Sequence, residues 1–377
     1  MRVLYVSKAL VSAVYRDKLE SLSTHCEVTA LVPERWGRHT PEPETVDVDI
    51  RWERTWLSGF NHFHVYPHAG ALLDEVRPDL VHIDEEPYSA VTWQFARLCR
   101  QRGIPFVFFA WQNIAKQLLP PFRGMRHRVF ADAAGGIAGT PDALDVLRRL
   151  GYPGPATVIP QFGVDAHRFY PNANERRDVR HTWRASEERF VIGYAGRLVP
   201  EKGVATLVRA VSRIPDADLV IVGDGSERDR LVALVKRLGC TSRVQFLGPL
   251  PSGAVGRALR GLDLLVLPSR STAGWTEQFG RVMVEAMATE VPVIATQTGS
   301  IPWVVNDAAV LVPPDDVEAL CGAIRALVAR PIRRTELATK GRELVARRFT
   351  TPIVARETVE WYRSVLGGRV ADMVGVS

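Results

Sequence analysis

The sequence has few cysteines and no long apolar run, and both features exclude classes of protein to which it could belong. Its four cysteines, Cys26, Cys99, Cys240 and Cys321, are widely spaced and form no C-x-x-C pair. Zinc-binding modules and disulfide frameworks are therefore not indicated, and a reducing compartment is favoured. No apolar run reaches the roughly 18 residues that a membrane-spanning helix requires. We expect a cytoplasmic protein, with peripheral contact at the inner membrane face as a further possibility.

Acidic residues are absent between Glu86 and Asp132, a span that holds seven Lys and Arg. Within it, residues 116–128 mix basic and apolar side chains, which predicts contact with an anionic membrane surface; an ordinary basic loop is the alternative. No known nucleic-acid-binding module occurs, so we expect no nucleic acid partner. His62, His64 and His68 lie close together in sequence, but loop histidines at this spacing are more often structural than metal ligands, and we expect no metal.

Net charge differs between the two halves of the chain. Residues 1–165 hold 18 Lys and Arg against 19 Asp and Glu, whereas residues 166–377 hold 30 against 23. The second half is therefore basic, which suits a polyanionic ligand.

Short apolar runs alternate with amphipathic segments along the chain, as in βαβ units around parallel sheets. The alternation fails between Pro160 and Arg189, which makes this the best linker, and it restarts at Phe190. With 377 residues, two domains are expected. We predict an N-terminal domain over 1–165, a C-terminal domain over 166–349 and a final helical segment over 350–377. Both domains are predicted to be doubly wound, with ligands at the carboxyl ends of their strands.

Two carboxylates eight positions apart, Glu277 and Glu285, bracket a predicted helix start after Gly280. The unpaired N–H groups of a helix start bind anions. Upstream, Arg197 and Lys202 follow a predicted strand, and two cations at such a place suit a diphosphate. Solvated surface charge is the alternative reading of each feature taken alone.

Taken in order, these elements resemble the retaining family 4 glycosyltransferases of the two-domain GT-B class. The resemblance covers the second half through Tyr194-Ala195-Gly196-Arg197, Glu201-Lys202-Gly203, Val222-Gly223-Asp224-Gly225, Phe246-Leu247-Gly248, Leu267-Pro268-Ser269 and the run from Glu277-Gln278-Phe279-Gly280 to Glu285-Ala286-Met287-Ala288. It implies two Rossmann-like α/β domains facing a cleft. The first would hold the acceptor, the second would hold the sugar nucleotide, and the last helix would cross back to the first.

The resemblance also implies roles for single residues. Arg197 and Lys202 would contact the diphosphate and, with Glu277, form the catalytic set. Glu277 would bind hydroxyls of the donor sugar and Glu285 those of the ribose. Further donor contacts would come from Gly196, Gly223, Gln278, Phe279 and Gly280, although Gly223 fits a purely structural turn equally well. The implied reaction needs no protein nucleophile, cofactor or metal.

The first half departs from the family pattern. The usual glycine pair after the first strand is replaced by Ser7-Lys8-Ala9-Leu10-Val11-Ser12, where Lys8 could supply charge instead. Trp111 aligns with a position that is often histidine. In the second half, Trp303 aligns with a position that is often glutamate. We predict that Trp111 lines the cleft. Glu86, together with Glu85, is predicted to contact the acceptor or assist as a base, with a surface role as the alternative.

The sequence therefore predicts a metal-independent retaining glycosyltransferase that moves a sugar from a nucleoside-diphosphate sugar to a hydroxyl acceptor. The acceptor could be a saccharide, a lipid-linked molecule or a small molecule. Two alternatives stay open: a non-catalytic or degenerate sugar-nucleotide-binding protein, and another GT-B activity such as a sugar-nucleotide epimerase.

Overall fold

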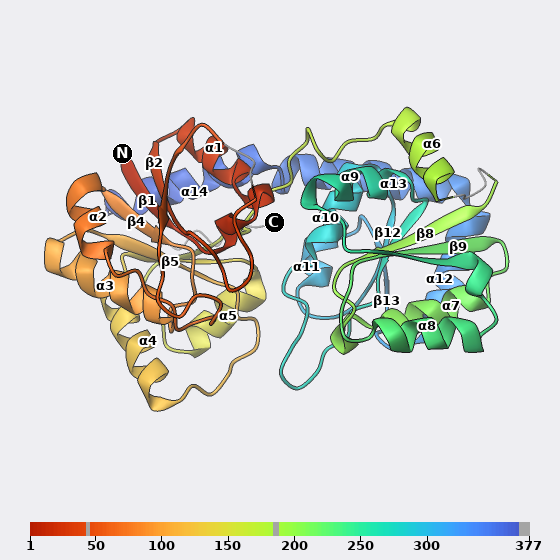
Figure 1. Cartoon of the computed structure of the whole chain (residues 1–377), viewed down its shortest axis with the longest axis horizontal. Coiled ribbons are helices and arrows are strands. Elements are labelled where there is room, and N and C mark those ends of the chain that lie inside the picture. Colours follow the sequence, from red (N-terminus) through yellow and green to blue (C-terminus); the bar gives the residue numbers. More distant parts are fainter. Residues whose placement is uncertain (43–45, 184–187, 369–377) are drawn as a thin grey trace. The chain divides into compact units, whose positions relative to one another are not determined.

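The computed structural model describes residues 1–42, 46–183 and 188–368, which form two compact units (Figure 1). The first unit comprises Met1–Gly163 together with the chain from Thr351, and the second comprises Val164–Thr350. Each unit contains one parallel sheet with helices on both faces.

The first sheet is built from seven parallel strands in the order β3-β2-β1-β4-β5-β6-β7. Its strands are β1 (Arg2–Val6), β2 (Glu27–Pro33), β3 (Asp49–Glu53), β4 (Leu80–Ile83), β5 (Phe106–Ala110), β6 (Gly135–Ala138) and β7 (Ala156–Val158). Every residue of β4, β5 and β6 is buried, as expected for a parallel sheet covered on both faces. The strand order reverses direction between β1 and β4, so loops at their carboxyl ends diverge there.

Helices and short 3-10 turns connect these strands: η1 (Ala9–Val11), η2 (Ala13–Tyr15), α1 (Asp17–Ser23), α2 (Ala69–Val76), α3 (Ala90–Arg102), α4 (Pro120–Asp132) and α5 (Pro141–Arg149). Helix α5 has a capped start. The Thr140 hydroxyl accepts a hydrogen bond from the Ala143 N–H at 3.4 Å, and Pro141 occupies the first turn, where its missing N–H has no cost.

The last helix of the described chain, α14 (Thr351–Leu366), belongs to the first unit. It packs against α1 (Figure 1), and its buried face includes Val359, Trp361 and Tyr362. The Tyr362 hydroxyl bonds to Nδ1 of His82 on β4. The predicted return of the C-terminal helix to the first domain is thus confirmed.

The second sheet has six parallel strands in the order β10-β9-β8-β11-β12-β13. They are β8 (Phe190–Ala195), β9 (Ala217–Val222), β10 (Val244–Gly248), β11 (Leu264–Leu267), β12 (Val293–Thr296) and β13 (Val310–Val312). The strand order reverses between β8 and β11, so this unit too is doubly wound. The predicted fold class, with two Rossmann-like parallel-sheet domains, is confirmed.

The helices of the second unit are α6 (Ala173–Thr182), η3 (Pro200–Lys202), α7 (Val204–Ser212), α8 (Arg228–Arg237), η4 (Thr241–Arg243), α9 (Ser252–Arg260), α10 (Arg281–Ala288), α11 (Ile301–Val305), α12 (Val317–Ala329) and α13 (Pro331–Arg348). One sequence-based prediction fails here. The segment between Pro160 and Arg189 is not simply a linker, because it contains α6, which packs against α9. Asn172 caps α6 by accepting from the N–H groups of Asn174 and Glu175.

Candidate functional site

The chain reversal between β8 and β11 brings predicted donor-site residues together at the carboxyl edge of the second sheet. Gly196 and Arg197 follow β8, Lys202 ends η3, and Ser269 follows β11. In doubly wound sheets, ligands bind where the strand order reverses, outside the carboxyl ends of the strands. The position of these residues is therefore the one expected of a binding site.

Lys202 and Glu277 lie 75 positions apart in sequence and form an ion pair, with Lys202 Nζ 2.5 Å from Glu277 Oε2. The Ser269 hydroxyl donates to the same carboxylate oxygen at 2.7 Å. Glu277 is only 5% exposed, and the Lys202 ammonium lies 5.0 Å from the centre of the Trp275 ring. The structure therefore joins the two predicted elements, and it adds Ser269 and Trp275, for which the sequence analysis predicted no role.

Two glycines bring the ends of β8 and β9 close together. A Cβ on Gly223 would lie 1.9 Å from the Gly196 carbonyl oxygen, and the Gly223 φ is +127°. Gly223 therefore has a structural role, while its contact with a nucleotide stays a prediction. The Arg197 side chain is exposed, and its carbonyl accepts from the Tyr194 hydroxyl at 2.7 Å.

Helix α10 begins at Arg281, directly after Gly280, whose φ of +73° is favourable for glycine. Glu285 lies in its second turn, buried, with Oε1 2.8 Å from Nε of Arg281. Burial raises the pKa of Glu285, and Arg281 opposes that shift. Gln278 is exposed, whereas the Phe279 ring packs edge-on against Phe349, 5.5 Å between centroids.

The turn around Gly299 holds the backbone of Glu277. The Ser300 N–H donates to the Glu277 carbonyl at 3.0 Å, and a Cβ on Gly299 would lie 2.1 Å from the same oxygen. Trp303, four residues after Gly299, packs edge-on against Phe349 and under the Arg348 guanidinium. Trp303 thus has packing partners within the second unit.

The first unit gathers polar residues at the corresponding edge of its sheet. Lys8, after β1, forms an ion pair with Glu85, after β4. Glu86 is buried, and its Oε1 accepts from the N–H groups of Trp111 and Gln112, each at 2.9 Å. The structure thus brings Lys8, Glu85, Glu86 and Trp111 together. It places Glu86 behind Trp111, in contact with its backbone.

Across the described ranges, no three His, Cys, Asp or Glu side chains gather as metal ligands would. His64 is buried, with Nε2 3.9 Å from Glu85 Oε1 and its ring edge-on to Trp36 at 4.8 Å.

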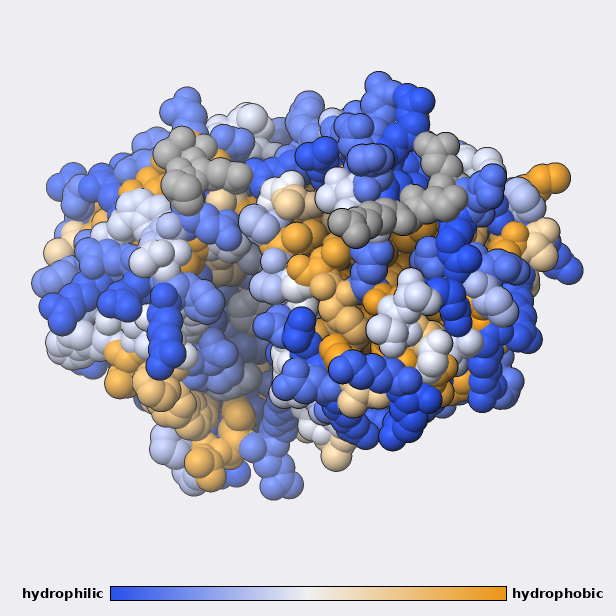
Figure 2. Space-filling model, turned by 45° about the vertical axis from the view of Figure 1, so that its right-hand side comes forward, coloured by the Kyte–Doolittle hydropathy of each residue, from blue (hydrophilic) through white to orange (hydrophobic). Residues whose placement is uncertain are grey.

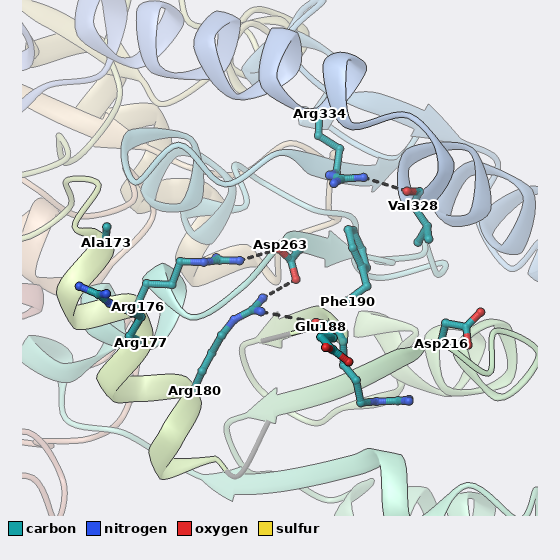
Figure 3. A pocket seen from close by; sticks show the side chains of 11 residues that line it. Ala173, Arg176, Arg177, Arg180, Glu188, Phe190, Asp216, Asp263, Val328 and Arg334 are labelled. Atoms are coloured by element: carbon teal, nitrogen blue, oxygen red, sulfur yellow. Dashed lines mark hydrogen bonds and ion pairs between the residues drawn. The ribbon is translucent and has the colours of Figure 1, made fainter. Parts of the chain in front are cut away.

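A cavity of about 620 Å³ beside α6 is lined by several arginines (Figure 3). Arg176 and Arg180 both point from α6 to Asp263, and Arg176 also donates to the Leu262 carbonyl. Arg334 donates to the Leu327 and Val328 carbonyls at the end of α12. These cations tie helices to the unit, so they account for part of the basic charge in the second half without a ligand.

Two family profiles match successive parts of the chain. The profile of glycosyl transferases group 1 matches residues 175–344, and that of the glycosyl transferase 4-like domain matches residues 13–161.

Curated relatives agree with these profiles. The chain is 32% identical over 272 residues to the lipopolysaccharide core biosynthesis glycosyltransferase LpsD of Rhizobium meliloti. The aligned region covers 68% of this chain and 75% of that protein. It is 33% identical over 220 residues to the D-inositol 3-phosphate glycosyltransferase of Mycobacteroides abscessus, covering 56% of this chain and 48% of the relative. The chain thus spans about half the length of this second relative.

Solved structures share the fold. Sucrose-phosphate synthase from Thermosynechococcus elongatus aligns over 98% of this chain and 100% of its own, with a TM-score of 0.76 and 21% identity. Anabaena HepE, solved in complex with UDP-glucose, aligns over 97% of this chain and 100% of its own, with a TM-score of 0.76 and 19% identity. The profiles, the LpsD relative and the two doubly wound sheets agree, and the chain belongs to the group 1 glycosyltransferases, the family 4 enzymes of the GT-B fold.

Proposed function

We propose that this glycosyltransferase moves a sugar from a nucleoside-diphosphate sugar to a saccharide hydroxyl, with retention of anomeric configuration and without a metal ion. The observation that carries the proposal is the contact of Lys202 and Ser269 with the buried Glu277 at the carboxyl edge of the second sheet. The UDP-glucose bound to HepE and the lipopolysaccharide role of LpsD support the donor and acceptor classes.

The proposed reaction breaks the bond between the anomeric carbon and a phosphate oxygen and forms a bond to the acceptor oxygen on the same sugar face. The acceptor proton passes to the departing phosphate oxygen, so no protein nucleophile is needed. Lys202 and the exposed Arg197 would offset the negative charge that grows on the leaving diphosphate. Glu277, held by Ser269, would orient the sugar hydroxyls, and Glu285 would bind the ribose.

The first experiment screens UDP-, GDP-, ADP- and dTDP-sugars by thermal shift, since a ligand that binds the folded state raises Tm with its concentration. The best donor is then incubated with saccharide acceptors in the presence and absence of EDTA, and the product anomer is identified by proton NMR. Retained configuration in EDTA supports the proposal. An inverted product, or transfer abolished by EDTA, contradicts it.

The same assay separates the two alternatives. A non-catalytic binding protein would be stabilised by a sugar nucleotide yet show neither transfer nor slow donor hydrolysis. An epimerase would change the sugar of the donor with no acceptor present.

We also propose that residues 116–128 contact a membrane, and the exposure of their side chains supports this prediction. Lys116, Arg123 and Arg128 are exposed, and Leu119 is 70% exposed at the start of α4. Figure 2 shows apolar side chains gathered low on the first unit, at the height at which Figure 1 draws α4. In the described part of the chain, no helix combines the length and apolar character needed to cross a bilayer.

A further inference from the structure

A cavity of about 440 Å³ opens at the carboxyl edge of the first sheet, and all its lining residues belong to the first unit. Its walls come from the turns after β1, the segment around Trp36, and Trp111 with Gln161 and Phe162. The cavity lies where the strand order reverses between β1 and β4, which is the ligand position in doubly wound sheets. Its volume is in the range of small-molecule pockets.

Aromatic rings form much of the lining. Tyr15 and Phe162 stack with centroids 4.2 Å apart and planes 22° from parallel. Trp36 and Trp111 both lie near the Lys8 ammonium, with ring centres at 5.5 and 5.7 Å from Nζ. All four aromatic side chains are only partly buried, so ring surface is available to a ligand.

Trp111 is held at two points by polar side chains. Its N–H donates to Glu86 Oε1 at 2.9 Å, and its indole Nε1 donates to Gln161 Oε1 at 2.7 Å. The Gln161 amide in turn donates to the buried Asp84 at 3.0 Å. Rings fixed in this way lose little conformational freedom on binding, which favours recognition over simple packing.

Glu85, which lies between Asp84 and Glu86 after β4, is also buried and forms an ion pair with Lys8. Asp84, Glu85 and Glu86 are all less than 5% exposed, so they support the wall of the cavity and do not line it. Because Glu85 pairs with Lys8, the ammonium does not add an uncompensated charge to the cavity. The lining also contains the carboxylate of Glu42, which accepts from the Ala13 N–H at 2.8 Å and from the Ser12 hydroxyl at 3.3 Å. The lining thus favours a neutral ligand over a phosphorylated or carboxylated one.

Polar side chains also line the cavity, among them Ser12, His39 and Thr40. Flat aromatic surface combined with polar side chains matches a pyranose ring, which presents C–H groups on its faces and hydroxyls around its edge.

We propose that this cavity is the acceptor subsite and that it binds a neutral pyranose unit of a saccharide, stacked against Trp36 and Trp111. Glu86 is assigned as a positioning residue that fixes Trp111. The proposal rests on the proposed function for the identity of the acceptor, but binding of a saccharide to the cavity is measurable without any transfer.

The test uses the full chain and methyl hexopyranosides as probes, with binding followed by saturation-transfer NMR. Trp36→Leu and Trp111→Leu should each weaken binding at least about fivefold, since loss of a stacking tryptophan typically has a large effect. Trp56→Leu is the matched control, because Trp56 is 63% exposed and outside the cavity lining. Unchanged binding in both cavity variants, or binding of phenol or an alkyl alcohol but of no pyranoside, overturns the proposal.

A second test compares two variants of Glu86, so that loss of positioning can be distinguished from loss of the fold. Glu86→Ala frees the Trp111 turn and should raise the saccharide dissociation constant at least about fivefold, whereas Glu86→Gln keeps an acceptor oxygen and should restore most of the affinity. Equal binding by wild type and Glu86→Ala contradicts the positioning role. Nucleoside-diphosphate binding, measured on the same samples by calorimetry, should not change. If wild type binds pyranosides but no nucleotide, the proposed function fails while the subsite stands.

Discussion

At the scale of single residues, the ion pair between Lys202 and Glu277 is the main evidence for the proposed donor site. The sequence motif predicted that each residue binds the donor, but their ion pair could not be predicted because the two lie in different loops 75 positions apart. The supporting hydroxyl of Ser269 was missed, although its motif was recognised, because its orientation depends on the end of β11.

We expect Glu277→Gln to reduce kcat by at least about tenfold, as removal of one preorganised catalytic group commonly does. The amide keeps the shape of the side chain but loses the charge that pairs with Lys202, so Tm should fall, and turnover is compared at a temperature at which the variant is folded. Glu201→Gln, on the same 3-10 turn as Lys202, is the control and should keep wild-type turnover. Transfer at the wild-type rate by Glu277→Gln would remove Glu277 from the reaction.

The buried carboxyl group of Glu86 leads us to expect that the free energy of unfolding depends on pH. Burial raises the pKa of Glu86 to about 7, while the N–H groups of Trp111 and Gln112 and the nearby Lys8 oppose the shift and Glu85 adds to it. The folded state therefore binds this proton more tightly than the unfolded chain. Its contribution to stability is full below about pH 4.5 and is lost as pH rises to about 7, with an effect on the order of 3 kcal/mol.

Glu86→Gln removes this proton, so we expect the fall in unfolding free energy between about pH 5 and pH 7 to be shallower than in wild type. Part of the fall should remain, because burial also raises the pKa of Glu85 to about 7. Denaturant unfolding at several pH values measures the slope. The exposed Glu20→Gln should keep the wild-type slope, and an identical slope in Glu86→Gln would show that Glu86 does not titrate in this window.

At the scale of elements, most buried strands were predictable because apolar runs bounded by turn residues identify them. The apolar runs Leu80–Ile83, Leu264–Leu267 and Val310–Val312 form β4, β11 and β13. Helices α4, α6 and α13 are hard to predict from the sequence for a shared physical reason. Each is rich in charge and has few buried side chains, so its apolar periodicity is weak, and α6 and α13 depend on side-chain contacts with the rest of their unit.

Helix α6 depends on Asp263, whose carboxylate pairs with both Arg176 and Arg180. We expect Asp263→Ala to destabilise the second unit by roughly 3 kcal/mol, because it leaves two largely buried guanidinium groups without their partner. Asp216→Ala, at the same cavity, is the control. Denaturant unfolding measures both, and a change below about 1 kcal/mol in Asp263→Ala would mean that these ion pairs are dispensable.

At the scale of the whole molecule, the distribution of charged residues along the sequence predicted only part of the surface charge. The basic second half suggested a polyanionic ligand, but arginines such as Arg243 and Arg260 donate to backbone carbonyls of their own unit. The acid-free span was a better guide to surface charge, since Lys116, Arg123 and Arg128 are exposed. Arg126 is an exception, because it is buried against Phe130.

If residues 116–128 contact a membrane, the chain should co-sediment with phosphatidylglycerol vesicles more strongly than with phosphatidylcholine vesicles. Salt at 0.5 M should weaken that binding by screening. The double variant Lys116→Glu with Arg123→Glu should bind about thirtyfold less, because each basic residue contributes about 1 kcal/mol. Arg97→Glu, which reverses one exposed charge on α3, is the control. Equal sedimentation with both lipids would count against membrane contact.

The membership of α14 in the first unit has a consequence for synthesis. The second unit is one continuous segment, Val164–Thr350, whereas the first unit lacks α14 until the ribosome has passed through the whole second unit. Trp361 and Tyr362 complete one face of the first core. We therefore expect the usual order of domain folding during translation to be reversed. The N-terminal unit, although made first, would be the last to finish, and a nascent chain stalled before α14 would expose the core face that the helix covers.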